Sequence, residues 1–163
     1  MIKRLFSAAV EGISGYEVQV EVDARPVEDT GRMTVVGLPD AAVRESVQRV
    51  TAALTNSSFF RPGDMLVTVN LAPADVRKQG PGFDLPIALA LEMAIQENYR
   101  DVPEAFKRRV PTGLDAWCFV GELALDGMVR GDGAGRRYAQ GAARADGEVS
   151  ARNPDACSVL RLV

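Results

Sequence analysis

The sequence contains no histidine and only two cysteines, Cys118 and Cys157, among its 163 residues. The two cysteines form no CxxC pair, so the sequence has neither the ligand pattern of a zinc site nor the residues of a histidine-based catalytic triad. Cysteines that are this few and this far apart are typical of a reduced protein. We therefore expect a cytoplasmic location.

Long apolar runs and a basic charge excess are also missing. No stretch approaches the roughly 20 consecutive apolar residues that cross a bilayer. Glu11 and Gly12 interrupt the N-terminal apolar run before it reaches the length of a signal-peptide core. We expect no membrane partner. Because the net charge is −3 at pH 7, any contact with DNA must come from a local basic patch or from partner subunits.

The residues that are present are typical of a soluble globular domain, with 47% hydrophobic and 25% charged residues. Alternation places Tyr16, Val18, Val20 and Val22 on one face of a strand whose other face is polar. Further strands are predicted at about residues 5–10, 33–36, 65–70 and 117–125, and Asp126-Gly127 predicts a hairpin turn into Met128 and Val129.

Helices are predicted from an N-cap at Asp40 to about Asn56, from Asp84 to about Gln96, and from Pro103 to Arg109. The first has an apolar stripe, and we interpret its opposite face as solvated: Arg44, Glu45, Gln48 and Arg49. The second is too apolar for a surface helix and should pack against the sheet. The order β-β-β-α-β-α-α-β-β predicts a mixed α/β (α+β) sheet with helices mainly on one face.

Residues 131–163 differ in character from residues 1–130. The stretch from Gly131 to Arg144 is rich in glycine, alanine and arginine and adds little to a core. Two interpretations remain open, a basic arm that touches nucleic acid and a disordered or adventitious end. A frameshift, a truncated gene product and a natural divergent domain would each give this pattern.

The most informative stretch leads from a strand through Lys78-Gln79-Gly80-Pro81-Gly82 into the helix at Asp84. A loop of this kind offers backbone N–H groups at a helix N-terminus. It predicts an anion or DNA contact made by Arg77, Lys78, Gly80 and Gly82; the alternative is that glycine and proline only permit a tight turn. The phosphate-binding pattern GxxxxGK[ST] occurs nowhere in the chain, so we expect no ATP, magnesium or other cofactor to bind here.

Other polar residues have simpler structural interpretations. No base lies beside the serines that could act as nucleophiles, Ser7, Ser14 and Ser46. Four aspartates that could suggest a metal cluster are scattered among separate elements and are interpreted as caps and loop partners, Asp23, Asp40, Asp75 and Asp84. For Trp117 we favour a core or rim position over stacking on a nucleic-acid base.

The chain contains four ordered blocks: Val36-Gly37-Leu38-Pro39-Asp40 with the helix start after it, Val69–Asp75, Gly80–Pro86 and Phe119–Gly127. Together these blocks resemble the ComM/YifB family of magnesium-chelatase-like proteins. The resemblance covers about residues 3–130. It implies the N-terminal domain of that family, with the fold shared by Lon-type protease domains and known as ribosomal-protein-S5 domain-2-like.

This fold relation raises the question of peptidase activity. Lon-type proteases use a Ser-Lys dyad whose serine follows Gly-Pro in the loop that matches this one. Gly82 occupies the serine position here, and the chain has no lysine after the hairpin, where such a protease supplies its base. We therefore expect no catalytic residue and no peptidase activity.

Full-length relatives resemble ring-forming AAA+ ATPases, and ComM-like members are associated with DNA branch migration during natural transformation. The resemblance implies a non-catalytic accessory domain, here without the motor that would bind ATP and magnesium. Its expected partners are DNA, an AAA+ motor domain or further copies in a homo-oligomer. The alternatives are a standalone adaptor that binds another protein through its sheet edge, and a truncated nonfunctional remnant.

Overall fold

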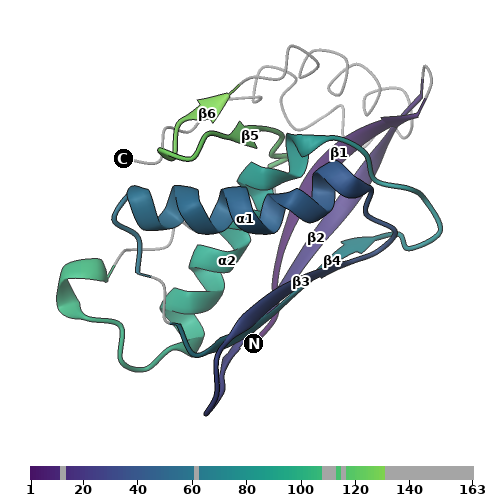
Figure 1. Ribbon diagram of the computed structural model, residues 1–163. Helices are drawn as coiled ribbons and strands as arrows, with labels where there is room; N and C mark the ends of the chain where they lie inside the picture. The colour runs from purple at the N-terminus through teal and green to yellow at the C-terminus, as the bar shows by residue number, and fades with distance from the viewer. Residues whose placement is uncertain (12–13, 61–62, 108–112, 115–116, 131–163) are drawn as a thin grey trace.

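The computed structural model describes residues 1–11, 14–60, 63–107, 113–114 and 117–130. These residues form a mixed α/β domain in which a four-stranded sheet carries two helices on one face (Figure 1). The predicted fold class is confirmed. The elements are β1 (Lys3–Glu11), β2 (Ser14–Pro26), β3 (Arg32–Val36), α1 (Ala41–Asn56), β4 (Met65–Ala72), α2 (Asp84–Asn98), β5 (Glu122–Leu123) and β6 (Val129–Arg130).

The sheet has the strand order β1-β2-β4-β3. β2 is antiparallel to both β1 and β4, whereas β3 is parallel to β4. The β3–β4 register pairs Val36 with Asn70, close to the C-terminal end of each strand. Because the two strands point the same way, the turn that follows β3 and the loop that follows β4 leave the sheet at the same end.

The alternation predicted for β2 decides which face of the sheet is buried. Val18, Val20 and Val22 are fully buried, and α2 packs against β2 and β1 on that side. Gln19, Glu21 and Asp23 point to the opposite face and are only partly buried. Alternating apolar and polar residues thus produce a sheet with one dry and one wet face.

Helix α1 begins where the sequence predicts it. The Asp40 carboxylate caps the helix by accepting a hydrogen bond of 2.8 Å from the Val43 N–H, which satisfies one of the donors left free at a helix start. Val43, Val50 and Leu54 are buried as expected, and Val47 is partly exposed. The predicted N-cap is confirmed.

Helix α2 lies between the sheet and the rest of the domain, as its composition predicts. A short 3₁₀ helix, Pro81–Phe83, precedes it, and most of its residues from Asp84 to Ile95 are buried. The third predicted helix, Pro103–Arg109, is different: the structure shows a single 3₁₀ turn at Glu104–Phe106. Residues 108 and 109 lie outside the described residues.

The strand predicted over Trp117–Leu125 is wrong as a single element. Cys118 bridges β1 at Phe6, and only Glu122–Leu123 forms β5. The chain turns away from the sheet because Gly121 makes two backbone bonds near the start of α2: its N–H donates to Gly82 and its carbonyl accepts from Leu85. Local propensity predicts the extended conformation, but tertiary hydrogen bonds decide its partners.

The hairpin turn at Asp126-Gly127 is confirmed. Gly127 has a positive φ of 84°, which glycine adopts without steric cost. The Asp126 carboxylate accepts a bond of 3.0 Å from the Met128 N–H and so stabilises the turn. The predicted Gly/Ala/Arg-rich tail, residues 131–163, lies outside the described residues. Within the described part of the chain no helix has both the length and the hydropathy for a membrane span.

The turn after β3 holds two consecutive residues at positive φ, Gly37 at 96° and Leu38 at 53°. For a leucine this left-handed conformation costs about 1–2 kcal/mol. Gly37 packs directly on β4, since a Cβ atom on it would lie 2.1 Å from the Leu71 carbonyl oxygen. Close contact between the turn and β4 therefore fixes the backbone from which Leu38 projects.

We predict that Gly37→Ala destabilises the domain much more than Gly80→Ala. Both glycines have a positive φ, but a Cβ on Gly80 would meet nothing within 4 Å. Gly80→Ala should therefore cost only the conformational penalty of about 1 kcal/mol, while Gly37→Ala should cost about 3 kcal/mol or more because backbone must move. Chemical denaturation of both variants measures the two free energies of unfolding. Equal losses would contradict the packing of this turn on β4.

Candidate functional site

The loop between β4 and α2, residues 73–80, carries most of the residues predicted to bind an anion. It lies beside the turn that follows β3. The Lys78 N–H donates to the Leu38 carbonyl at 3.2 Å, and the Asp40 N–H donates to the Lys78 carbonyl at 3.0 Å. The parallel pairing of β3 and β4 thus continues beyond the strands and attaches this loop to the start of α1.

Lys78 does not reach the surface. Its side chain is fully buried, and its ammonium donates to the carbonyls of Pro73 and Val76, the latter at 2.7 Å. Burial lowers the pKa of Lys78, and the Asp75 carboxylate partly opposes that shift. The predicted outward contact of Lys78 with an anion is therefore corrected: the ammonium binds carbonyl groups of its own loop.

Arg77, the neighbouring residue, is exposed. Its backbone is fixed, because the Tyr16 hydroxyl donates to the Arg77 carbonyl at 2.9 Å. Among the residues that the structure describes, no carboxylate forms an ion pair with the Arg77 guanidinium. Arg77 is thus a cation held in place by its main chain with its side chain open to solvent.

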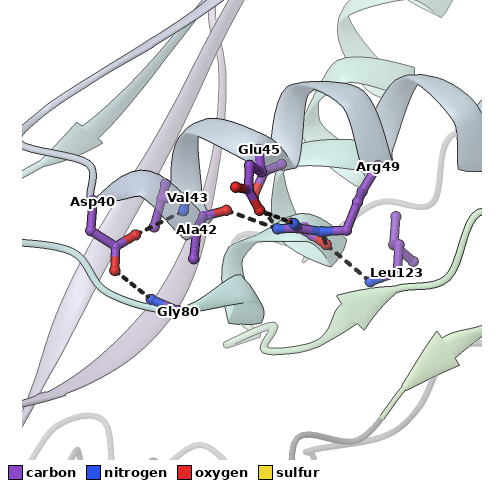
Figure 2. Close-up of polar contacts among 9 residues, drawn as sticks. Asp40, Ala42, Val43, Glu45, Arg49, Gly80 and Leu123 are labelled. Atoms are coloured by element: carbon purple, nitrogen blue, oxygen red, sulfur yellow. Dashed lines mark hydrogen bonds and ion pairs between the residues drawn. The ribbon is translucent and has the colours of Figure 1, made fainter.

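The two glycines of the predicted anion site are engaged by the protein itself. The Gly80 N–H donates to Asp40 Oδ2 at 3.2 Å, while Oδ1 of the same carboxylate caps α1 (Figure 2). Gly82 is buried, and its carbonyl accepts a bond of 2.8 Å from the Gly121 N–H. The sequence predicts that the Gly80 N–H donates to an external anion. In the structure it donates to the Asp40 carboxylate of the protein itself.

A buried ion pair that the sequence did not reveal lies behind this loop. Asp84, fully buried at the start of α2, accepts two hydrogen bonds from Arg49 of α1, from Nε at 2.6 Å and from Nη2 at 3.0 Å. The hydrogen bond to Asp84 raises the pKa of the Arg49 guanidinium. Arg49 also donates to the Ala42 carbonyl at 2.9 Å, and the Leu123 N–H donates to Asp84 at 3.2 Å (Figure 2).

The interpretation of Arg49 as part of a solvated helix face is therefore wrong. Arg44, Glu45 and Gln48 are exposed as predicted, whereas the Arg49 side chain is only 19% exposed. Two signals in the sequence could have indicated this pair: Arg49 borders the apolar stripe of its helix, and Asp84 directly precedes the apolar stretch Leu85–Leu91. A carboxylate at such a position needs a partner, because burying an unpaired charge is costly.

The remaining candidates lie apart from one another in the part of the chain that the structure describes. In the described part of the chain, histidine, cysteine, aspartate and glutamate side chains form no group of three that could hold a metal ion. Ser46 is buried and accepts a hydrogen bond from Arg49 at 3.2 Å, and Ser7 is buried in β1. Trp117 is 41% exposed, which fits the rim position and not the core.

We predict that Arg49→Ala lowers the free energy of unfolding by about 3 kcal/mol, because it leaves the Asp84 carboxylate buried without its cation. Arg44→Ala, on the exposed face of the same helix, is the matched control and should change stability by less than about 0.5 kcal/mol. The double variant Arg49→Ala/Asp84→Ala should lose less than the sum of the single variants. Additive losses in urea denaturation would contradict a direct pair.

Comparison with known proteins agrees with this architecture. The family model ChlI, described as subunit ChlI of Mg-chelatase, matches residues 20–147. This match continues past Arg130 into the segment predicted from composition to be a separate tail.

Three relatives illustrate the similarity. The uncharacterized protein YifB of Escherichia coli is 37% identical over 123 residues, which cover 76% of this chain and 22% of that protein. YifB of Salmonella typhimurium is 41% identical over 99 residues, 61% of this chain and 17% of that protein. Competence protein ComM of Haemophilus influenzae is 37% identical over 129 residues, 78% of this chain and 22% of that protein.

The chain thus spans about a fifth of the length of these relatives. Its mixed sheet with helices on one face agrees with the Lon-protease-like fold that the resemblance implies. The family model and these two relatives, YifB of Escherichia coli and ComM, each match more than two thirds of this chain. This chain belongs to the ComM/YifB family of magnesium-chelatase-like proteins and corresponds to the N-terminal domain of that family.

Proposed function

We propose that this chain is a non-catalytic accessory domain that holds DNA for an AAA+ motor, and that the motor alone binds ATP and magnesium. Two features support the absence of chemistry in the domain. The sequence has no GxxxxGK[ST] loop, and glycine stands where a Lon-type protease has its serine. Gly82 is buried, and its neighbour Lys78 donates to loop carbonyls, so neither supplies a nucleophile or a base.

The observation that carries the proposal of DNA contact is the fixed and exposed position of Arg77. Three hydrogen bonds hold the loop around it. The Lys78 N–H donates to the Leu38 carbonyl, and the Gly80 N–H donates to the Asp40 carboxylate. The Arg77 carbonyl accepts from the Tyr16 hydroxyl. A loop that is already ordered loses little conformational freedom on binding. A guanidinium presented in this way is suited to the phosphate backbone of DNA, whose oxygens it can bind through two N–H groups.

One arginine per domain gives only weak binding, and the net charge of −3 opposes it at long range. The expected arrangement is therefore an assembly in which more than one copy contributes its Arg77 to the same DNA. Linked weak contacts increase the overall affinity strongly when the geometry allows them to bind together. This accounts for a domain that takes part in DNA binding without being basic overall.

We predict that Arg77→Ala weakens the binding of the chain to fluorescently labelled duplex DNA and lowers the slope of log affinity against log salt by about 1. Arg25→Ala is the matched control, because Arg25 is exposed at the opposite end of the sheet and carries the same charge. It should leave the slope unchanged. Fluorescence anisotropy at several salt concentrations measures both quantities.

The same salt titrations show whether Lys78 contacts DNA directly or only holds the loop that carries Arg77. Lys78→Met should lower the free energy of unfolding, since two loop carbonyls lose their donor, but should leave the salt slope close to that of the wild type. Equal slopes for wild type and Arg77→Ala, or a loss of slope on Lys78→Met alone, would refute the assignment of DNA contact to Arg77.

A further inference from the structure

The two edges of the four-stranded sheet differ in what covers them. On the β1 side, Cys118 forms a parallel bridge with Phe6, and the Phe119 N–H donates to the Phe6 carbonyl at 2.8 Å. β3 forms the other edge. Among the residues that the structure describes, none pairs with the outer side of β3. The free N–H and C=O groups of an edge strand can accept a further strand.

β3 has few of the features that discourage such pairing. It contains no proline, lysine or glutamate, and Arg32, at its first position, is its only charged residue. Met33 and Val35 pack against the core, which leaves Arg32, Thr34 and Val36 exposed. Natural edge strands are usually protected by charges, proline or a bulge, so the exposed β3 is suited to a partner.

Apolar side chains continue this edge beyond the end of the strand. Val36 is 42% exposed and Leu38 is 54% exposed. The Leu38 backbone is fixed in a left-handed conformation, with φ of 53°, and its carbonyl accepts the Lys78 N–H. A strained residue that projects an apolar side chain into solvent from a fixed backbone is typical of a binding surface.

We propose that β3 pairs antiparallel with β3 of a second copy of this chain, around a two-fold axis at Thr34. In this register Arg32 lies opposite Val36 of the other copy, and Met33 lies opposite Val35. Thr34 lies opposite its own equivalent. A two-fold axis makes every contact occur twice, and the pairing joins the two sheets into one continuous sheet through both copies.

The distribution of charge along β3 favours a second copy as the occupant. Because Arg32 stands at one end of the strand, antiparallel pairing places the two arginines at opposite ends, so no like charges face each other. The aliphatic part of Arg32 can cover the exposed Val36 of the other copy. The pair of threonines at the axis adds a favourable cross-strand contact. An unrelated extended peptide would meet the same backbone groups but would not have this reciprocal match.

Sedimentation equilibrium over a range of protein concentrations, at physiological ionic strength, tests the proposal. The wild-type chain should approach twice the mass of one chain. Thr34→Lys and Thr34→Glu each place like charges opposite each other at the axis, and each should raise the dissociation constant of the dimer about fivefold or more. An equimolar mixture of the two variants should restore association, because lysine then faces glutamate.

Thr55→Lys is the matched control, since it makes the same change at an exposed position on α1 and should leave the dimer unchanged. Val36→Glu gives a second readout that does not depend on Thr34: the new carboxylate would face Arg32 of the other copy and tighten the dimer. A wild-type chain that stays at the mass of one chain at every concentration overturns the proposal. So does a wild-type dimer whose Thr34 mixture fails to associate, because the pairing would then involve another surface.

Discussion

The carboxylate of Asp84 is the group on which the arrangement of this domain depends. It is fully buried at the start of α2, and it accepts hydrogen bonds from Arg49 of α1 and from the backbone of Leu123 in β5. A buried charge stabilises a fold only when all of its partners are in place. The pair therefore sets the distance between the two helices and the position of the hairpin. It thereby also sets where the loop before α2 lies.

That loop shows how the protein uses its cations in different ways. Lys78 and Arg77 are neighbours in sequence, yet the ammonium of Lys78 is buried against carbonyl groups while Arg77 is exposed. The lysine is suited to the inner role because its ammonium carries three N–H donors, which can bind several carbonyls at once. The planar guanidinium is the better group for a phosphate. Asp40 completes the arrangement, because it caps α1 and holds Gly80.

Local patterns in the sequence predicted the fold well, because β2, α1 and α2 owe their form to periodicity and capping. The alternation around Val20 and the cap at Asp40 involve residues close together in the chain. The candidate site was less predictable. Whether Arg49 and Lys78 face water depends on groups brought together by tertiary structure, such as Asp84, which is 35 residues from Arg49 in sequence. For the same reason, the extended propensity near Gly121 could not reveal that its partners are Gly82 and Leu85.

The segment from Cys118 to Leu123, near the C-terminal end of the described residues, contacts three parts of the domain that precede it in the chain. It covers the edge of β1, bonds to Gly82 and supplies the last donor to Asp84. During synthesis the chain leaves the ribosome from its N-terminus. The edge of β1 and the Asp84 carboxylate therefore lack these partners until residues 118–123 have emerged. Contacts between distant parts of a chain form slowly because a large loop must close first. A nascent chain that ends before Cys118 therefore has both helices and the Arg49–Asp84 pair, but it leaves the edge of β1 uncovered and Asp84 without the Leu123 donor.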